Sequence, residues 1–176
     1  SEYLRHNAPN HNSLIMASKS SLEIERKFLV TSADYRDQAV DKQDMIQGFL
    51  SRDPRRTVRV RLAGDQAWLT IKGMSSADGT SRFEWEKPIT KDHGLALMEL
   101  ALPGRIQKSR FTVHHNGFCF EVDEFKGENQ GLILAEIELT HAQQSFDRPQ
   151  WLGQEVTQDP RYYNAQLSLQ PFTQWE

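Results

Sequence analysis

The chain has 176 residues, 38% of them hydrophobic with nine Phe and four Trp, which is enough apolar material for one globular domain with a core. Its formal net charge of −3 argues against a surface given over to nucleic acid, and no apolar run approaches the roughly 20 residues of a membrane span. A single cysteine, Cys119, cannot form an internal disulfide, so the composition predicts a soluble protein of a reducing cytoplasm.

The first 20 residues differ in composition from the rest of the chain. They hold Asn, His, Ser and Pro with hardly any apolar periodicity, which predicts a flexible arm or an expression leader, with the natural start at Met16. Residues 21–176 are expected to form a single domain.

Most of the remaining chain has the period-two alternation of β-strands. It begins at residues 21–30, where Glu23, Glu25 and Lys27 face one way and the apolar residues between them face the other. Asn116-Gly117 is a strong hairpin signal between two later strands. Helices are predicted as a short turn within 31–40, a helix over 91–102 and a terminal helix around 161–169. Further strands are predicted over 44–52, 57–62, 67–72, 81–86, 106–114, 118–125 and 132–139.

The side chains that share a face with Glu23 and Glu25 are ionised on nearly every strand. A solvated sheet face usually mixes Thr, Ser, Gln and Asn with its charges, whereas here acids and bases are segregated onto different strands. If the sheet closes into a barrel with its apolar face outward under the helices, these charges line a wet lumen. The bases are Lys27, Arg59, Arg61, Lys72, Arg82, Lys108 and Arg110. The acids are Glu23, Glu25, Glu84, Glu86, Glu121, Asp123, Glu136 and Glu138.

Such a lumen has the chemistry to hold a polyanion together with metal ions. Mg²⁺ or Mn²⁺ takes carboxylate oxygens and keeps several waters, while Arg and Lys bind phosphate oxygens. The six His residues show no metal-ligand spacing, and neither nucleophile motifs nor a Gly-rich phosphate loop are present. Trp68, Trp85 and the Phe residues are expected at outward-facing strand positions covered by helices.

The ordered series of charged pairs resembles one known family. Glu23-x-Glu25-x-Lys27 is similar to the E-x-E-x-K signature of the triphosphate tunnel metalloenzymes, also called CYTH domains. The resemblance covers residue 22 to about residue 169 and is closest to the short stand-alone bacterial enzymes. It implies an α+β fold built on an eight-stranded antiparallel β-barrel, a tunnel with a charged lumen and a few helices packed outside. The matching segments that follow are Arg59-x-Arg61, Lys72, Glu84-x-Glu86, Lys108-x-Arg110, Asp123, Glu136-x-Glu138 and residues 155–164.

The resemblance also implies a role for each charged position. Glu136, Glu138 and Asp123 match the ligands of a metal ion that clamps a triphosphate, and Glu23 and Glu25 match a pair that holds or orients a second metal ion and its water. Glu84, Glu86 and Glu121 have no clear role and could pair with neighbouring bases. Lys27 and Lys72 are also catalytic candidates. The basic wall that grips the phosphates matches Lys27, Arg59, Arg61, Lys72, Arg82, Lys108 and Arg110.

One position departs from the family pattern. Relatives often carry Tyr where this chain has Phe49, and the tyrosine hydroxyl is thought to act with the lysine that matches Lys72. Its absence predicts that Lys72 acts with a different partner or only binds phosphate.

Together these features predict a metal-dependent hydrolase that converts inorganic triphosphate to pyrophosphate and phosphate, with two divalent ions, Mg²⁺ or Mn²⁺. The open alternatives are an adenylate cyclase of class IV type, a thiamine or nucleoside triphosphatase, and a non-catalytic polyphosphate-binding module. The expected partner is a small-molecule triphosphate, with no nucleic acid and no membrane. A monomer and a homodimer are equally compatible with the sequence.

Overall fold

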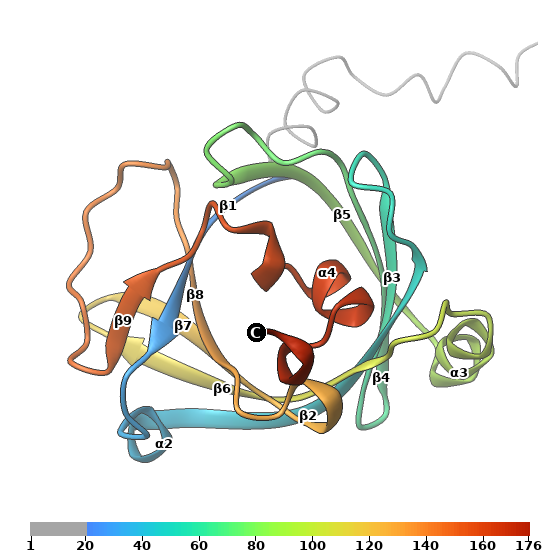
Figure 1. The fold of residues 1–176 in the computed structure, drawn as a ribbon, viewed down its shortest axis with the longest axis horizontal. Coiled ribbons are helices and arrows are strands. Elements are labelled where there is room, and N and C mark those ends of the chain that lie inside the picture. Colours follow the sequence, from blue (N-terminus) through green and yellow to red (C-terminus); the bar gives the residue numbers. More distant parts are fainter. Residues whose placement is uncertain (1–20) are drawn as a thin grey trace, which may run out of the picture.

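The computed structural model describes residues 21–176, and the predicted flexible arm at residues 1–20 lies outside them. Eight antiparallel strands form a closed ring in Figure 1. The order around the ring is β5, β4, β3, β2, β6, β7, β8 and β1, and β1 closes it by pairing with β5. This confirms the predicted eight-stranded barrel. The strands are β1 (Leu22–Val30), β2 (Ala39–Ser51), β3 (Thr57–Ala63), β4 (Gln66–Lys72), β5 (Ser81–Ile89), β6 (Ile106–His115), β7 (Phe118–Phe125) and β8 (Ile133–Glu138).

The sequence boundaries need several corrections. A ninth strand, β9 (Leu152–Glu155), was not predicted. It pairs with the C-terminal end of β1, at Phe28 and Val30. β2 begins at Ala39 rather than at residue 44, and β5 continues through Pro88, which was expected to end it. Asn116 and Gly117 adopt positive φ angles of 47° and 83°, which confirms the tight turn between β6 and β7.

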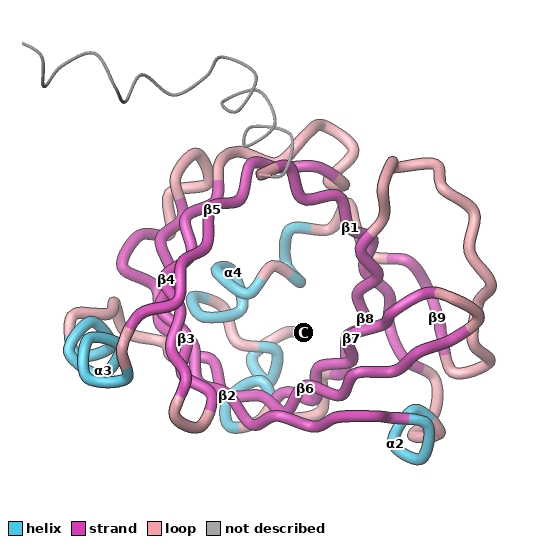
Figure 2. Tube along the Cα trace, turned by 180° about the vertical axis from the view of Figure 1, so that it is seen from behind, coloured by secondary structure: helices cyan, strands magenta, loops and turns pink. Residues whose placement is uncertain are grey.

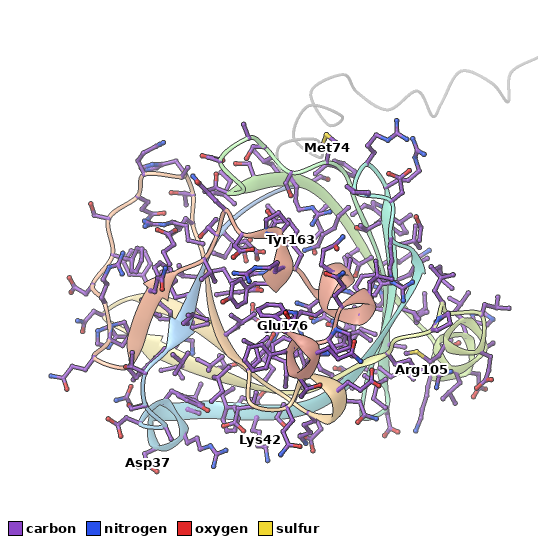
Figure 3. The ribbon with its side chains drawn as sticks, viewed as in Figure 1. Asp37, Lys42, Met74, Arg105, Tyr163 and Glu176 are labelled. Carbon is purple, nitrogen blue, oxygen red and sulfur yellow. The ribbon has the colours of Figure 1, made fainter. Side chains whose placement is uncertain are left out.

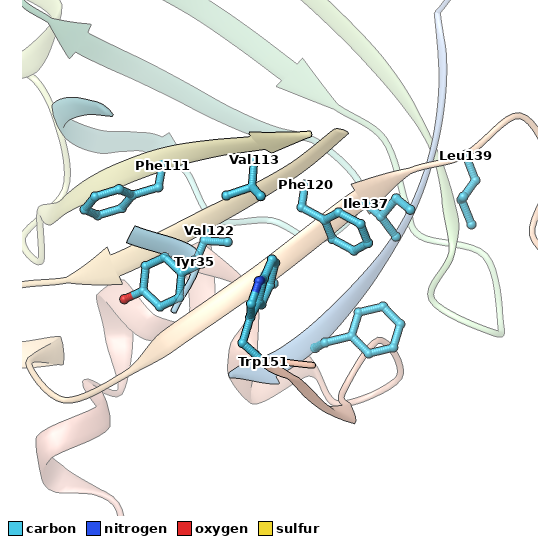
Figure 4. Close-up of a cluster of buried hydrophobic side chains, with 10 residues drawn as sticks. Tyr35, Phe111, Val113, Phe120, Val122, Ile137, Leu139 and Trp151 are labelled. Atoms are coloured by element: carbon cyan, nitrogen blue, oxygen red, sulfur yellow. The ribbon is translucent and has the colours of Figure 1, made fainter. Parts of the chain in front are cut away.

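The outer face of β6, β7 and β8 carries the main apolar core, shown in Figure 4. Trp151 lies on this face, 5.6 Å from Phe120 and 5.9 Å from Tyr35 between ring centroids. The indole N–H of Trp151 donates to the side-chain oxygen of Gln38, so the buried polar atom has a partner. The helix α2 (Tyr35–Gln38) and the segment leading to β9 therefore cover this side of the barrel.

A second helix covers a different part of the wall. α3 (Lys91–Glu99) packs outside β3 and β4 (Figure 2). Gly94 allows the close approach, because a Cβ atom there would lie 2.6 Å from the Cβ of Ala67. Thr90 caps the helix by accepting a hydrogen bond from the backbone N–H of His93.

The end of the chain closes one end of the lumen. The segment holds η2 (Pro160–Tyr162), α4 (Asn164–Leu169) and η3 (Phe172–Gln174), and it lies within the ring of strands in both Figure 1 and Figure 2. Leu167 of α4 packs with inward-facing apolar residues of the strands. The lumen is therefore charged over part of its length and apolar at this end. The buried members of this inner apolar cluster are Phe49, Ile106, Phe125, Leu132, Leu134, Val156 and Leu167.

The aromatic residues do not all lie where the sequence predicted. Trp68 lines the lumen rather than the outer surface, and Phe49 and Phe125 belong to the inner apolar cluster. Phe83 and Trp85 do face outward, but they are 49% and 40% exposed, so the helices within residues 21–176 leave them largely open to solvent. No helix within residues 21–176 is long and apolar enough to cross a membrane.

Candidate functional site

The lumen contains two connected cavities, of about 670 Å³ and about 440 Å³. Six charged residues line both of them and mark the middle of the lumen. Each base in this set stands near a carboxylate, and the set as a whole is electrically balanced. The shared residues are Glu23, Glu25, Arg59, Lys72, Arg110 and Glu136.

The structure brings nearly all of the predicted site residues to this lumen. Arg61, Glu84, Glu86, Glu121 and Glu138 line only the larger cavity. The smaller cavity alone is lined by Lys27, Arg82 and Lys108. Asp123 lines neither, because neighbouring bases enclose it.

Asp123 is the centre of a buried ion cluster. Its carboxylate accepts from Arg110 Nε at 2.8 Å and from Lys108 Nζ at 2.8 Å, and only 2% of the residue is exposed. Burial alone would raise the pKa of Asp123, but Arg110 and Lys108 outweigh it and hold that pKa well below its usual range. With both oxygens engaged, Asp123 in this arrangement positions the two bases.

Like charges face each other where β1, β7 and β8 pair. Glu25 lies directly across from Glu138, and Glu136 lies directly across from Glu121. Directly opposed like charges destabilise an antiparallel pair. Burial, together with the nearby carboxylate of Glu136, raises the pKa of Glu25 well above its ordinary value. Burial and the carboxylates of Glu23 and Glu121 likewise raise the pKa of Glu138.

Two lysines partly offset this negative charge. Lys72 Nζ lies 3.0 Å from Glu23 and 3.9 Å from Glu84, and Lys27 Nζ lies 3.4 Å from Glu136. Burial would favour the neutral amine of Lys27, but Glu136 and its neighbours outweigh it and raise the pKa. Burial also acts to raise the pKa of Glu136, which the bases Lys27 and Arg110 nevertheless lower to about 2.

The two arginines on β3 have N–H donors that no other group within residues 21–176 accepts. The Nε atoms of Arg59 and Arg61 are buried, and neither has a hydrogen-bond partner within the described part of the chain. Their Nη2 atoms lie 3.6 Å and 3.3 Å from Glu86, which also accepts from the hydroxyl of Thr70 at 2.7 Å. Burial, with Arg61 and Arg110 nearby, lowers the pKa of Arg59 to about 9. Positive charge therefore accumulates here without full compensation.

The three acids without a clear role in the sequence all pair with bases. Glu86 lies beside Arg59 and Arg61, Glu84 beside Lys72, and Glu121 Oε2 lies 2.7 Å from Arg110 Nη1. The sequence left open whether these acids pair with bases, and the structure places a base beside each of them.

The C-terminal segment supplies polar contacts that the sequence did not predict. Asn164 Oδ1 accepts from Lys108 Nζ at 2.8 Å and from Gln47 Nε2 at 2.9 Å. Tyr163, labelled in Figure 3, places its ring 5.2 Å from Lys27 Nζ. The only sequence signal for these contacts is the resemblance of residues 155–164 to the bacterial segment, which assigns no role to them.

Comparison with known proteins now decides the family. A family model described as the CYTH domain matches residues 21–165. The chain belongs to the CYTH family. It is 42% identical over 151 residues to an inorganic triphosphatase of Acetivibrio thermocellus, covering 85% of this chain and 95% of the relative. It is 36% identical over 152 residues to an inorganic triphosphatase of Nitrosomonas europaea, covering 84% and 97%.

Solved CYTH-like structures have the same fold. The crystal structure of an inorganic triphosphatase matches with a TM-score of 0.61 and 33% identity, over 84% of this chain and 94% of that one. A Hippeastrum protein, described as an adenylyl cyclase with a dominant triphosphatase activity, matches with a TM-score of 0.55 and 14% identity over 68% and 80%. At that identity the second likeness shows the fold alone.

Membership of the CYTH family implies dependence on a divalent metal ion, and the donor set of the lumen fits one. Glu25 and Glu138 offer hard oxygen atoms whose mutual repulsion a cation would relieve, and hard oxygens are what Mg²⁺ and Mn²⁺ prefer. Residues 21–176 hold no preassembled group of three or more His, Cys, Asp or Glu able to bind a metal ion. The carboxylates are instead spread along the lumen, which suits ions that keep several of their waters.

Proposed function

We propose that this CYTH protein is a metal-dependent hydrolase that splits inorganic triphosphate into pyrophosphate and phosphate. The observation that carries the proposal is that the larger cavity is lined both by Arg59 and Arg61, whose buried Nε donors have no partner among the described residues, and by the opposed carboxylates of Glu25 and Glu138. Such donors need an anion and such acids need cations. A triphosphate with divalent ions satisfies both, and the names of the two bacterial relatives support the choice of substrate.

The basic residues would bind the phosphate chain and stabilise the leaving group. Arg59, Arg61 and Arg110 line the larger cavity, and Arg59 and Arg110 also line the smaller one, so that their donors can reach phosphate oxygens on several sides. Lys27, Arg82 and Lys108 extend this basic wall along the smaller cavity. Negative charge that develops on the departing pyrophosphate is thereby stabilised by fixed positive charges.

The acidic residues would hold the metal ions and the attacking water. Glu23 and Glu25 are assigned to the ion that orients the water, and Glu136 and Glu138 to the ion that clamps the triphosphate. Bound Mg²⁺ or Mn²⁺ lowers the pKa of a coordinated water and neutralises phosphate charge. Asp123 orients Lys108 and Arg110 in this arrangement. Lys72, held by Glu23, binds phosphate beside the water.

A substrate panel tests this proposal. The protein is incubated with inorganic triphosphate, ATP or thiamine triphosphate, each with Mg²⁺ and with Mn²⁺, and both phosphate release and cyclic AMP are measured. We expect phosphate release to be fastest from inorganic triphosphate and to stop when the metal is chelated. Faster turnover of ATP with cyclic AMP formation would indicate a cyclase, and binding without turnover of any substrate would indicate a binding module.

A pair of isosteric variants controls for the site. Glu25→Gln removes a lumen charge, whereas Glu99→Gln makes the same chemical change on the exposed surface of α3. The proposal predicts loss of activity in the first and wild-type activity in the second. Full activity of Glu25→Gln would contradict it.

A further inference from the structure

Two amide side chains connect the C-terminal segment to a base of the smaller cavity. Asn164, the first residue of α4, accepts hydrogen bonds at its Oδ1 atom from Lys108 Nζ at 2.8 Å and from Gln47 Nε2 at 2.9 Å. Gln47 lies on β2 and Lys108 on the neighbouring β6, so this one oxygen joins both strands to the C-terminal segment. Asn164 and Lys108 line the smaller cavity, whereas Gln47 lines neither cavity.

Lys108 has one N–H donor left for a ligand. An ammonium group carries three donors. The carboxylate of Asp123, 2.8 Å from Lys108 Nζ, takes one and Asn164 takes another, and no third acceptor contacts the ammonium within residues 21–176. Lys108 is only 2% exposed and lines the smaller cavity, so a group bound in that cavity is what the third donor can reach. The two fixed contacts therefore set the direction of the free donor.

Gln47 is an unfavourable residue for the stability of the fold at this position. It is completely buried, and its Oε1 atom has no hydrogen-bond partner in the described part of the chain. A buried amide oxygen without a partner costs free energy, and a hydrophobic side chain of similar size would avoid that cost. Among the described residues, the bond to Asn164 is the only side-chain hydrogen bond that Gln47 makes. Its amide is therefore explained by what it does to Asn164 rather than by stability.

From this geometry we infer that Gln47 and Asn164 are positioning residues for substrate binding. Gln47 fixes the amide of Asn164, and Asn164 fixes the ammonium of Lys108 so that its free donor meets a phosphate oxygen. The inference rests on the proposed function. A donor that is held in place before the ligand binds loses less conformational freedom on binding than a mobile one. The C-terminal segment thus contributes to the affinity for triphosphate as well as closing one end of the lumen.

The competing interpretation is that the amides only hold the C-terminal segment against the strands. Asn129 provides the matched control, because it fixes the same segment through a different contact. Its Oδ1 atom accepts from the backbone N–H of Phe172 at 2.9 Å, and the residue is 3% exposed. Asn164→Leu and Asn129→Leu make the same chemical change at the two places. Gln47→Met removes the inner amide with little change in volume.

The affinity for inorganic triphosphate is measured by calorimetry with a chelator present, KM and kcat by steady-state kinetics with Mg²⁺, and stability by thermal melts. We expect Asn164→Leu to weaken the affinity and raise KM about tenfold and Gln47→Met about threefold, because the charge-assisted contact to phosphate is misdirected. In both variants kcat should change by less than about twofold. Gln47→Met should not lower the melting temperature. Asn129→Leu should lower the melting temperature and leave affinity and KM within about twofold.

A double-mutant cycle separates action through Lys108 from direct contact with the substrate. Asn164→Leu and Gln47→Met are repeated in a Lys108→Met background, which lacks the ammonium but keeps a long side chain. If the amides act through Lys108, each should change affinity and KM by less than about twofold in that background. Equal fold-changes with and without Lys108 would overturn the inference. Unchanged affinity in Asn164→Leu, or an equal loss of affinity in Asn129→Leu, would overturn it as well.

The inference and the proposed function fail in different ways. If the unsubstituted protein neither binds nor hydrolyses inorganic triphosphate, the proposed function is wrong and the inference falls with it. If the unsubstituted protein hydrolyses triphosphate but the cycle with Lys108 is additive, only the inference is wrong.

Discussion

The inner and outer faces of β6, β7 and β8 are both buried, but they are built for different purposes. The outer face holds aromatic rings packed edge to face around Phe120 and Trp151. On the inner face of the same strands, charged groups such as Lys108 and Asp123 are as deeply buried as the rings. Buried apolar contact stabilises a fold, whereas buried charge costs free energy unless it is paired. The outer face therefore holds the barrel together and the inner face is arranged for a ligand.

The largest expected effect is a loss of activity, and it comes from a substitution on the inner face. Replacing Glu25 with Gln should lower kcat/KM for inorganic triphosphate by about 10³-fold, because an ionised oxygen ligand is lost from the site. The variant should be at least as stable as the wild type at neutral pH. Burial and Glu136 raise the pKa of Glu25, so its ionised form destabilises the folded state as pH rises through that pKa. Steady-state kinetics and a thermal melt check both parts, and an inactive variant with a clearly lower melting temperature would contradict the account.

The outer face should respond in the opposite way. Phe120 is fully buried, and Phe120→Ala should lower the free energy of unfolding by about 3–5 kcal/mol through lost contacts and a cavity. Denaturant titration measures the loss. The milder Phe120→Leu should cost about 1.5 kcal/mol and leave kcat of the folded protein unchanged. A large fall in kcat for Phe120→Leu would show that the two faces are not independent.

The raised pKa of Glu25 also predicts a pH profile. The carboxyl is protonated below that pKa and cannot then hold a cation, so kcat/KM should fall about tenfold per pH unit on the acid side. This acid limb should move to lower pH as the metal concentration rises, because protons and metal ions compete for the same oxygens. Profiles measured at two metal concentrations give the test, and an acid limb that does not respond to metal would assign it to another group.

The smallest effect is expected where the inner apolar cluster meets the charged lumen. Phe49 is 4% exposed and lines the smaller cavity. Since Lys72 already has Glu23 and Glu84 as partners, Phe49→Tyr should change kcat by less than about threefold and lower the free energy of unfolding by about 1 kcal/mol. A tenfold gain in kcat would show that a tyrosine hydroxyl at this position supplies a missing catalytic group.

The charged lumen was predictable because alternation along a strand fixes which side chains share a face. The same rule also predicts the position of Trp68. It alternates with Leu69 and lies on the same face of its strand as Thr70 and Lys72, so it faces inward. Expecting aromatic rings to face outward was the error there. Alternation does not give the height of a residue along the barrel, so the apolar end around Phe49 and Leu167 could not be foreseen.

Other features depend on contacts between distant parts of the chain. β9 has only four residues, too few to establish a period, and its pairing with β1 defines it. Asn164 reaches Lys108 across 56 positions in the sequence, a distance that no local pattern can specify. Alternation marked all eight barrel strands, and the family resemblance supplied their closure into a tunnel.

The most direct test of the inner face as a hydrolytic site is to incubate the protein with inorganic triphosphate and Mg²⁺ in ¹⁸O-labelled water and to identify the products by ³¹P NMR. If water attacks the terminal phosphorus and pyrophosphate leaves, the label appears in orthophosphate and not in pyrophosphate. Unchanged triphosphate, or label in the newly formed pyrophosphate, would contradict the account.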